Sequence, residues 1–174
     1  LQYARINETD DIYAFDEKGV LLTASRFEKQ LKQAEILEPD QSSLLNIEIK
    51  DPGGNLITGY KPTVQVSAMP YTLMAQSVLE MRKQNGHSSR YDEVRINVSG
   101  YRDYRGVPVF GIWKWHSKLG MGLTLEIDID EALADYYSTR RTLFLVVALT
   151  FLLSVMTTLL TLIVGEQSGK VLQK

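Results

Sequence analysis

The chain contains no cysteine, so neither a disulfide nor a thiolate metal site can form. Its two histidines, His87 and His116, lie far apart without a carboxylate cluster beside either one, so we expect surface or loop positions rather than metal ligands. A net charge of −2 and a pI near 5.7 lack the basic excess typical of nucleic-acid-binding proteins. The glycines of Asp51–Asn55 are not followed by the Lys of a phosphate-binding loop, and no nucleophile–base pair is evident. We therefore predict no catalytic residue, cofactor or metal site.

Charge is also absent from one long stretch near the end of the chain. The 22 residues from Leu143 to Val164 include no charged residue, Pro, Gly, Asn or Gln. As a helix they would extend about 33 Å, which is enough to cross the roughly 30 Å hydrocarbon core of a bilayer. The alternative is a buried core helix, but such a helix normally carries a polar stripe, and this one has none. We predict a transmembrane helix.

The span divides the chain into four parts. We predict one domain over residues 1–130, a juxtamembrane helix over 131–142, the span over 143–164 and the start of a further region over 165–174. The basic residues beside the span count two against two, Arg140 and Arg141 before it and Lys170 and Lys174 after it, so local charge does not decide its orientation. Because the chain opens on Leu1, we expect it to be a piece of a longer protein.

The first half of the domain combines short strands and helices. We expect a hairpin over 11–24, a helix over about 26–35 that starts at a Ser25–Glu28 capping box, and a strand over 44–50. A turn over 51–55 should follow, and then a helix over 63–83 in two parts divided at Pro70.

The second half alternates apolar and polar residues along three strands. Within 94–99, 107–115 and 123–130 the apolar side chains recur at every second position, which predicts an antiparallel meander with one buried face. On that face we expect Val94, Ile96 and Val98, then Val107, Val109, Gly111, Trp113 and Trp115, then Leu123, Leu125, Ile127 and Ile129. Thr124, Glu126, Asp128 and Asp130 would then face solvent. A capping box at Asp128–Glu131 predicts one continuous helix from the last strand into lipid.

Three strings in this order resemble the membrane-proximal Cache module of bacterial transmembrane receptors. They are IYAFDEKGVLLTASRFEKQL, LLNIEIKDPGGNLITGYKP and YRDYRGVPVFGIWKW…LGMGLTLEIDIDEAL, and the resemblance covers about residues 8–164. It implies an α+β fold, a PAS-like antiparallel sheet with flanking helices, followed by one transmembrane helix. It also implies a periplasmic sensor domain on the bacterial cytoplasmic membrane, with 131–142 as signalling helix and 165–174 inside the cell.

The same resemblance implies partners and a role. The module would sense or relay the binding of an amino acid, an organic acid or an amine, as a homodimer in contact with membrane lipid. The cytoplasmic output domain would be a histidine kinase of a two-component system, a cyclase or a similar enzyme, while this fragment itself is not an enzyme. The alternative is a membrane-anchored structural or protein-interaction module without a small-molecule ligand.

A pocket between a PAS-like sheet and the middle segment would need a few polar groups in an apolar lining. Arg26 is a candidate carboxylate clamp, with a surface arginine at a helix start as the alternative. Asp103 would hold an ammonium group, or else close a turn before Gly106. The aromatic candidates are alternatively core residues. The full candidate set is Tyr13, Phe15, Arg26, Asn46, Asp51, Tyr101, Arg102, Asp103, Trp113 and Trp115.

Overall fold

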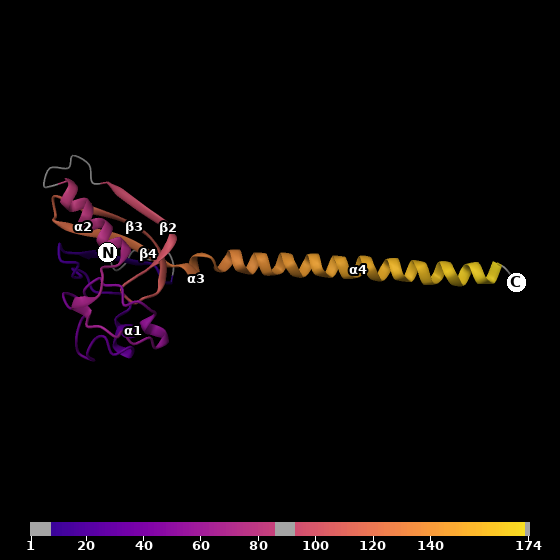
Figure 1. Ribbon diagram of the computed structural model, residues 1–174, viewed down its shortest axis with the longest axis horizontal. Coiled ribbons are helices and arrows are strands. Elements are labelled where there is room, and N and C mark those ends of the chain that lie inside the picture. The colour runs from indigo at the N-terminus through magenta and orange to yellow at the C-terminus, as the bar shows by residue number, and fades with distance from the viewer. Residues whose placement is uncertain (1–7, 86–92, 173–174) are drawn as a thin grey trace. The chain divides into compact units, whose positions relative to one another are not determined.

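The computed structural model describes residues 8–85 and 93–172, and Figure 1 shows the order of their elements. The chain divides into two compact units, residues 1–132 and residues 133–174. The first unit is an α+β domain built on one four-stranded antiparallel sheet. The second is a long apolar helix.

The sheet has the strand order β1-β4-β3-β2, and every neighbouring pair is antiparallel. Its strands are β1 (Asp11–Phe15), β2 (Val94–Arg102), β3 (Pro108–His116) and β4 (Met121–Asp128). The meander of β2, β3 and β4 confirms the prediction from the alternating residues. The first strand, β1, pairs with β4 and forms one edge of the sheet. The first and the last strands in chain order therefore lie side by side.

The segments between β1 and β2 are less regular than predicted. Val20–Ala24 and residues 44–50 form isolated bridges rather than strands, with Val20 opposite Glu48 and Lys50 opposite Tyr71. The helices are α1 (Glu28–Gln33), η1 (Leu56–Thr58), η2 (Val66–Ala68) and α2 (Leu73–Asn85). Of the helix predicted over 63–83, only the second part is an α-helix, because η2 is three residues long; Pro70 lies between η2 and α2, as the predicted division requires.

The prediction of a Ser25–Glu28 capping box is wrong. The helix α1 begins at Glu28, and the Oγ atom of Ser25 accepts from the amide of Phe27 instead. The carboxylate of Glu28 turns away to accept bonds from the hydroxyls of Ser42 and Ser43 and from the amide of Ser43. This carboxylate therefore ties α1 to the segment that follows Pro39 instead of closing its own first turn.

One face of the sheet packs against α2 and the middle segment. The predicted face of β3 is confirmed, since Val109, Trp113 and Trp115 are buried there. The α2 helix contributes Met74, Ala75, Val78 and Met81 to the same core. Tyr101 and Tyr104 also belong to this core, and the other members come from residues before α2, namely Tyr13, Phe15, Leu21, Leu31, Leu37, Ile47 and Ile49.

The predicted faces of β2 and β4 are reversed. The register places Thr124 beside Trp113 and Glu126 beside Gly111, so the polar side of β4 shares the core face. Glu126 is only 2% exposed, whereas Ile96 and Val98 on the outward face of β2 are 68% and 73% exposed. Alternation shows that two faces differ, but the partners across the sheet decide which one is covered. Here tyrosine hydroxyls make burial of the polar face possible.

The end of β4 leads to two helices rather than one. They are α3 (Ile129–Ala132) and α4 (Ala134–Leu172), with a break at Leu133. The stretch from Ala134 to Gly165 is long and apolar enough to cross a membrane, and it is exposed along its length within the part of the chain that the structure describes. That result agrees with the span predicted over 143–164.

Candidate functional site

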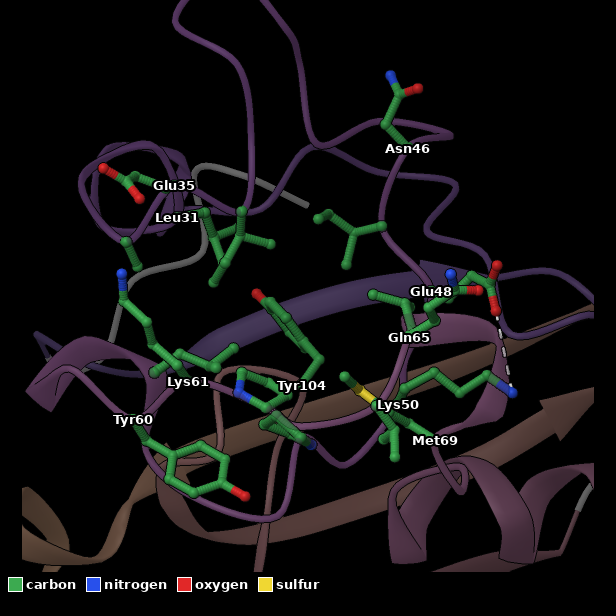
Figure 2. A pocket seen from close by; sticks show the side chains of 18 residues that line it. Leu31, Glu35, Asn46, Glu48, Lys50, Tyr60, Lys61, Gln65, Met69 and Tyr104 are labelled. Carbon is green, nitrogen blue, oxygen red and sulfur yellow. Dashed lines mark ion pairs between the residues drawn. The ribbon is translucent and has the colours of Figure 1, made fainter.

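The domain contains a cavity of about 460 Å³ between the middle segment and the core (Figure 2). This size lies within the range of roughly 300–1,000 Å³ that is typical of small-molecule sites. Its apolar lining comes from α1, from residues 47–56 and from the segment that carries η2, and includes Leu31, Ile47, Leu56, Val64, Val66 and Met69. Val64 and Val66 are half exposed at its edge. The cavity can therefore accept an apolar group from solvent.

Charged side chains of both signs surround this cavity. Figure 2 shows Glu35 and Lys61 on one side and Glu48 and Lys50 on the other. Lys50 lies 3.9 Å from the Glu48 carboxylate, and its ammonium nitrogen lies 3.6 Å from the centre of the Tyr71 ring. Glu35 also adopts a φ of 60°, a left-handed conformation that is uncommon for a residue with a side chain. The lining suits a small molecule with an apolar body and a charged or zwitterionic head.

Tyr104 connects the cavity with the polar core of the domain. Its side chain lines the cavity, and its hydroxyl donates to Asp11 at 2.8 Å. Because that hydroxyl has only one proton, the 2.7 Å contact between the Tyr104 and Ser25 oxygens is a bond donated by Ser25. Burial raises the pKa of the Tyr104 hydroxyl well above its usual value. The hydroxyl therefore stays protonated and keeps this bond to β1.

Glu126 is an almost fully buried acid on β4. Its carboxyl accepts from the hydroxyl of Tyr101 at 2.5 Å and from that of Tyr13 at 2.8 Å. Burial raises the pKa of Glu126 to about 8, the negative charge of Asp103 adds to the increase, and the two tyrosine bonds oppose it. Gly111 on β3 makes the arrangement possible, because a Cβ atom there would overlap the Tyr101 hydroxyl oxygen.

Arg105 forms the cationic centre of the same region. Its guanidinium donates to Asp103 and to Asp128 at 2.6 Å each, and it lies 3.6 Å from the centre of the Phe27 ring. Burial raises the pKa of Asp103 to about 6, although the charge of Arg105 opposes this increase. Asp128 ends β4, so Arg105 holds the last residue before α3. We call Asp11, Tyr13, Tyr101, Asp103, Tyr104, Arg105, Glu126 and Asp128 the buried polar network.

The candidate ligand residues fall into three groups. Only Asn46 lines the cavity, where its amide donates to the carbonyls of Ser42 and Leu44. Two candidate arginines pair with carboxylates of the chain itself: Arg26 with Asp10, and Arg102 with Asp51 through two bonds of 2.9 Å. The others lie in the core or the buried polar network, namely Tyr13, Phe15, Tyr101, Asp103, Trp113 and Trp115.

Several residues of this region were missed by sequence reasoning. Tyr104, Arg105 and Glu126 were not candidates, although the first two belong to the quoted string YRDYRG. Glu126 was expected to face solvent because it alternates with leucine and isoleucine. A signal was present, since Gly111 interrupts the apolar face of β3 opposite this residue. Glu35 lies at the end of the helix predicted over 26–35, and Lys61 precedes the helix predicted over 63–83. No signal in the sequence marks either residue as part of a cavity.

His116 does not line the cavity. His116 ends β3, and its Nδ1 atom accepts from the amide of Leu119 at 3.4 Å. His87 lies outside the described residues. Among residues 8–85 and 93–172 no group of His, Asp or Glu side chains has the arrangement of a metal site.

No protein-family model, curated protein or solved structure matches this chain. The fold and the site define an α+β domain followed by a helix that can cross a membrane. Its cavity and its buried polar network are the features on which a function can be argued.

Proposed function

We propose that the chain is the extracytoplasmic sensor module of a transmembrane receptor, of the PAS-like Cache kind. The domain would lie in the periplasm and α4 would cross the bacterial cytoplasmic membrane once. A small molecule in the cavity, or a change relayed from another module, would act on an output domain such as a histidine kinase or a cyclase. The module would work as a homodimer.

The observation that carries this proposal is the position of Tyr104. Its ring lines the cavity, its hydroxyl bonds to Asp11 on β1, and Asp11 pairs directly with Glu126 on β4. The same strand ends at Asp128, which Arg105 binds, and continues after five residues into α4. A ligand that moves Tyr104 would thus change contacts on the strand that leads to the span. A differential affinity of tenfold between two arrangements supplies about 1.4 kcal/mol of bias.

Thermal unfolding of the full chain in detergent tests the ligand. Apolar amino acids, organic acids and amines are added separately. We expect one of these classes to raise the melting temperature of the chain as its concentration increases. Ala34→Trp, which fills the cavity, should abolish the increase, whereas Ala132→Trp at the exposed end of α3 should keep it. A ligand effect that survives Ala34→Trp would place the site elsewhere.

A partner-binding module without a small-molecule ligand is the second candidate. The outward face of the sheet favours it, because Val94, Ile96 and Val98 are all more than half exposed along an edge strand. This candidate predicts no thermal shift with any of the three ligand classes.

A further inference from the structure

Two buried carboxyl groups occupy directly opposite positions on neighbouring strands. Asp11 on β1 pairs with Glu126 on β4, and the two residues are 5% and 2% exposed. Side chains opposite one another in an antiparallel pair have Cβ atoms roughly 5 Å apart, and like charges there are destabilising. Two carboxyl groups that lie opposite one another and are almost fully buried favour the state in which one of them keeps a proton.

The groups around the pair do not neutralise both charges. From β1 and β2 the neighbours of Glu126 are the neutral hydroxyls of Tyr13 and Tyr101. The loop after β2 adds the carboxyl of Asp103 and the guanidinium of Arg105, which is already shared between Asp103 and Asp128. The groups facing Asp11 are the Tyr104 hydroxyl and the positive charges of Arg26 and Arg105.

Charge counting therefore leaves a surplus of acids. Two positive charges, those of Arg26 and Arg105, lie among five carboxyl groups, those of Asp10, Asp11, Asp103, Glu126 and Asp128. The α2 helix offers no compensation, because the residues it places in the core are Met74, Ala75, Val78 and Met81. Within the described residues, every buried polar side-chain atom has a hydrogen-bond partner, so the surplus is one of charge and not of missing hydrogen bonds.

Two features of β2 and β3 bring a hydroxyl group to the Glu126 carboxyl. Gly111 lies opposite Glu126 on the other side of β4, and its missing side chain is what admits the Tyr101 hydroxyl. A register shift between Asn97 and Tyr101 pairs this tyrosine with Val109, two residues before Gly111 on β3. Both features bring the Tyr101 hydroxyl to the Glu126 carboxyl. A hydroxyl can donate to an ionised carboxyl group and accept from a protonated one.

We propose that Asp11 and Glu126 together bind one proton, and that loss of this proton in alkaline surroundings weakens the pairing of β1 with β4. The domain would then respond to the proton concentration outside the membrane in addition to any small molecule. This inference does not depend on a ligand in the cavity, so it can fail while the sensor function stands.

The direction of the pH dependence follows from proton linkage. Burial raises the pKa of both groups in the folded domain, that of Glu126 from 4.5 to about 8. Between these two pH values the folded state binds more protons than the unfolded state, so the free energy of unfolding falls as the pH rises. The stabilisation is complete below about pH 4.5 and is lost as the pH passes through about 8.

Thermal unfolding of the full chain in detergent between pH 5 and pH 9 tests the shared proton. The melting temperature of the unmodified protein should fall by roughly 5 °C or more across this range. Glu126→Gln and Asp11→Asn should each flatten the dependence, and the double variant should flatten it no further. Asp130→Asn, which removes an exposed carboxylate just beyond β4, should retain the slope of the unmodified protein. An unchanged slope in Glu126→Gln would overturn the inference.

Infrared difference spectra of the unmodified protein test the same point without a variant. Raising the pH from 6 to 9 should remove the band of one protonated carboxyl group, and the absence of this change contradicts the inference. Hydrogen exchange then tests the weakened pairing. The protection of β1 amides relative to β3 amides should fall over the same range, and a constant ratio alongside loss of the proton would overturn the structural consequence.

Discussion

At the scale of single residues, the domain depends on small side chains that let large polar ones meet. Gly111 has ordinary backbone angles, so backbone conformation does not explain why a glycine stands at this position. The reason is the space that a Cβ atom would take. The Tyr101 hydroxyl occupies this space and donates to Glu126. The absence of a side chain at Gly111 thus makes room for one of the two hydroxyls that donate to this buried acid.

We predict that Gly111→Ala lowers the free energy of unfolding by about 1–3 kcal/mol, because the new methyl group overlaps the Tyr101 hydroxyl. Denaturant titration of the full chain in detergent measures this. The same substitution in a Tyr101→Phe background should cost less, because the overlapping oxygen is gone. Val98→Ala on the outward face is the control and should be nearly neutral. Equal costs in both backgrounds would refute the steric explanation.

At the scale of elements, the junction between β4 and the span is the feature that matters for signalling. The break at Leu133 separates α3 from α4, so Ala134 is the first residue of a helix and not an interior one. Proline is tolerated in the first turn, where its missing N–H would have no partner within the helix. A helix-breaking test must therefore be placed further along α4.

Ser138→Pro should uncouple ligand binding from the response of the intact receptor, because it removes a backbone bond inside α4. Ligand affinity, measured by the thermal shift, should remain within about twofold because the cavity lies in the other unit. Ala134→Pro and Ser138→Ala are the matched controls, and both should signal normally. Normal signalling by Ser138→Pro would exclude α4 as the conducting element.

At the scale of the whole molecule, the two units suit different environments. The domain buries acids and tyrosines in a packed core, whereas α4 presents leucine, valine and phenylalanine on every side. A helix that is apolar all round is stable in lipid, where its own backbone bonds are satisfied. The two units can therefore be perturbed separately.

We expect Leu153→Arg to reduce the fraction of chain integrated in the membrane, since an arginine near the centre of a span costs about 2.5–3.5 kcal/mol. Resistance to alkaline extraction of membranes measures this fraction, and Leu153→Ile should behave like the unmodified chain. Because Leu153 belongs to the second unit, thermal unfolding of the domain in detergent should not change. Full integration of the arginine variant would contradict a single span at this position.

The sequence by itself determined the features that depend on neighbours in the chain. The span within α4 can be predicted by comparing the length of its apolar run with the thickness of a bilayer. The meander of β2, β3 and β4 follows from alternation, and the separation of η2 from α2 follows from Pro70. Each of these is a local property of the chain.

Only the tertiary structure decided which sides of β2 and β4 face the core. Tyr13 and Tyr101 reach Glu126 from positions 113 and 25 residues away, and no local pattern reveals partners at such separations. The cavity likewise forms between segments without periodicity, and the candidate arginines turn out to bind carboxylates of their own chain. Burial of a charge depends on what surrounds it in space, which is why the polar face of β4 became the interior.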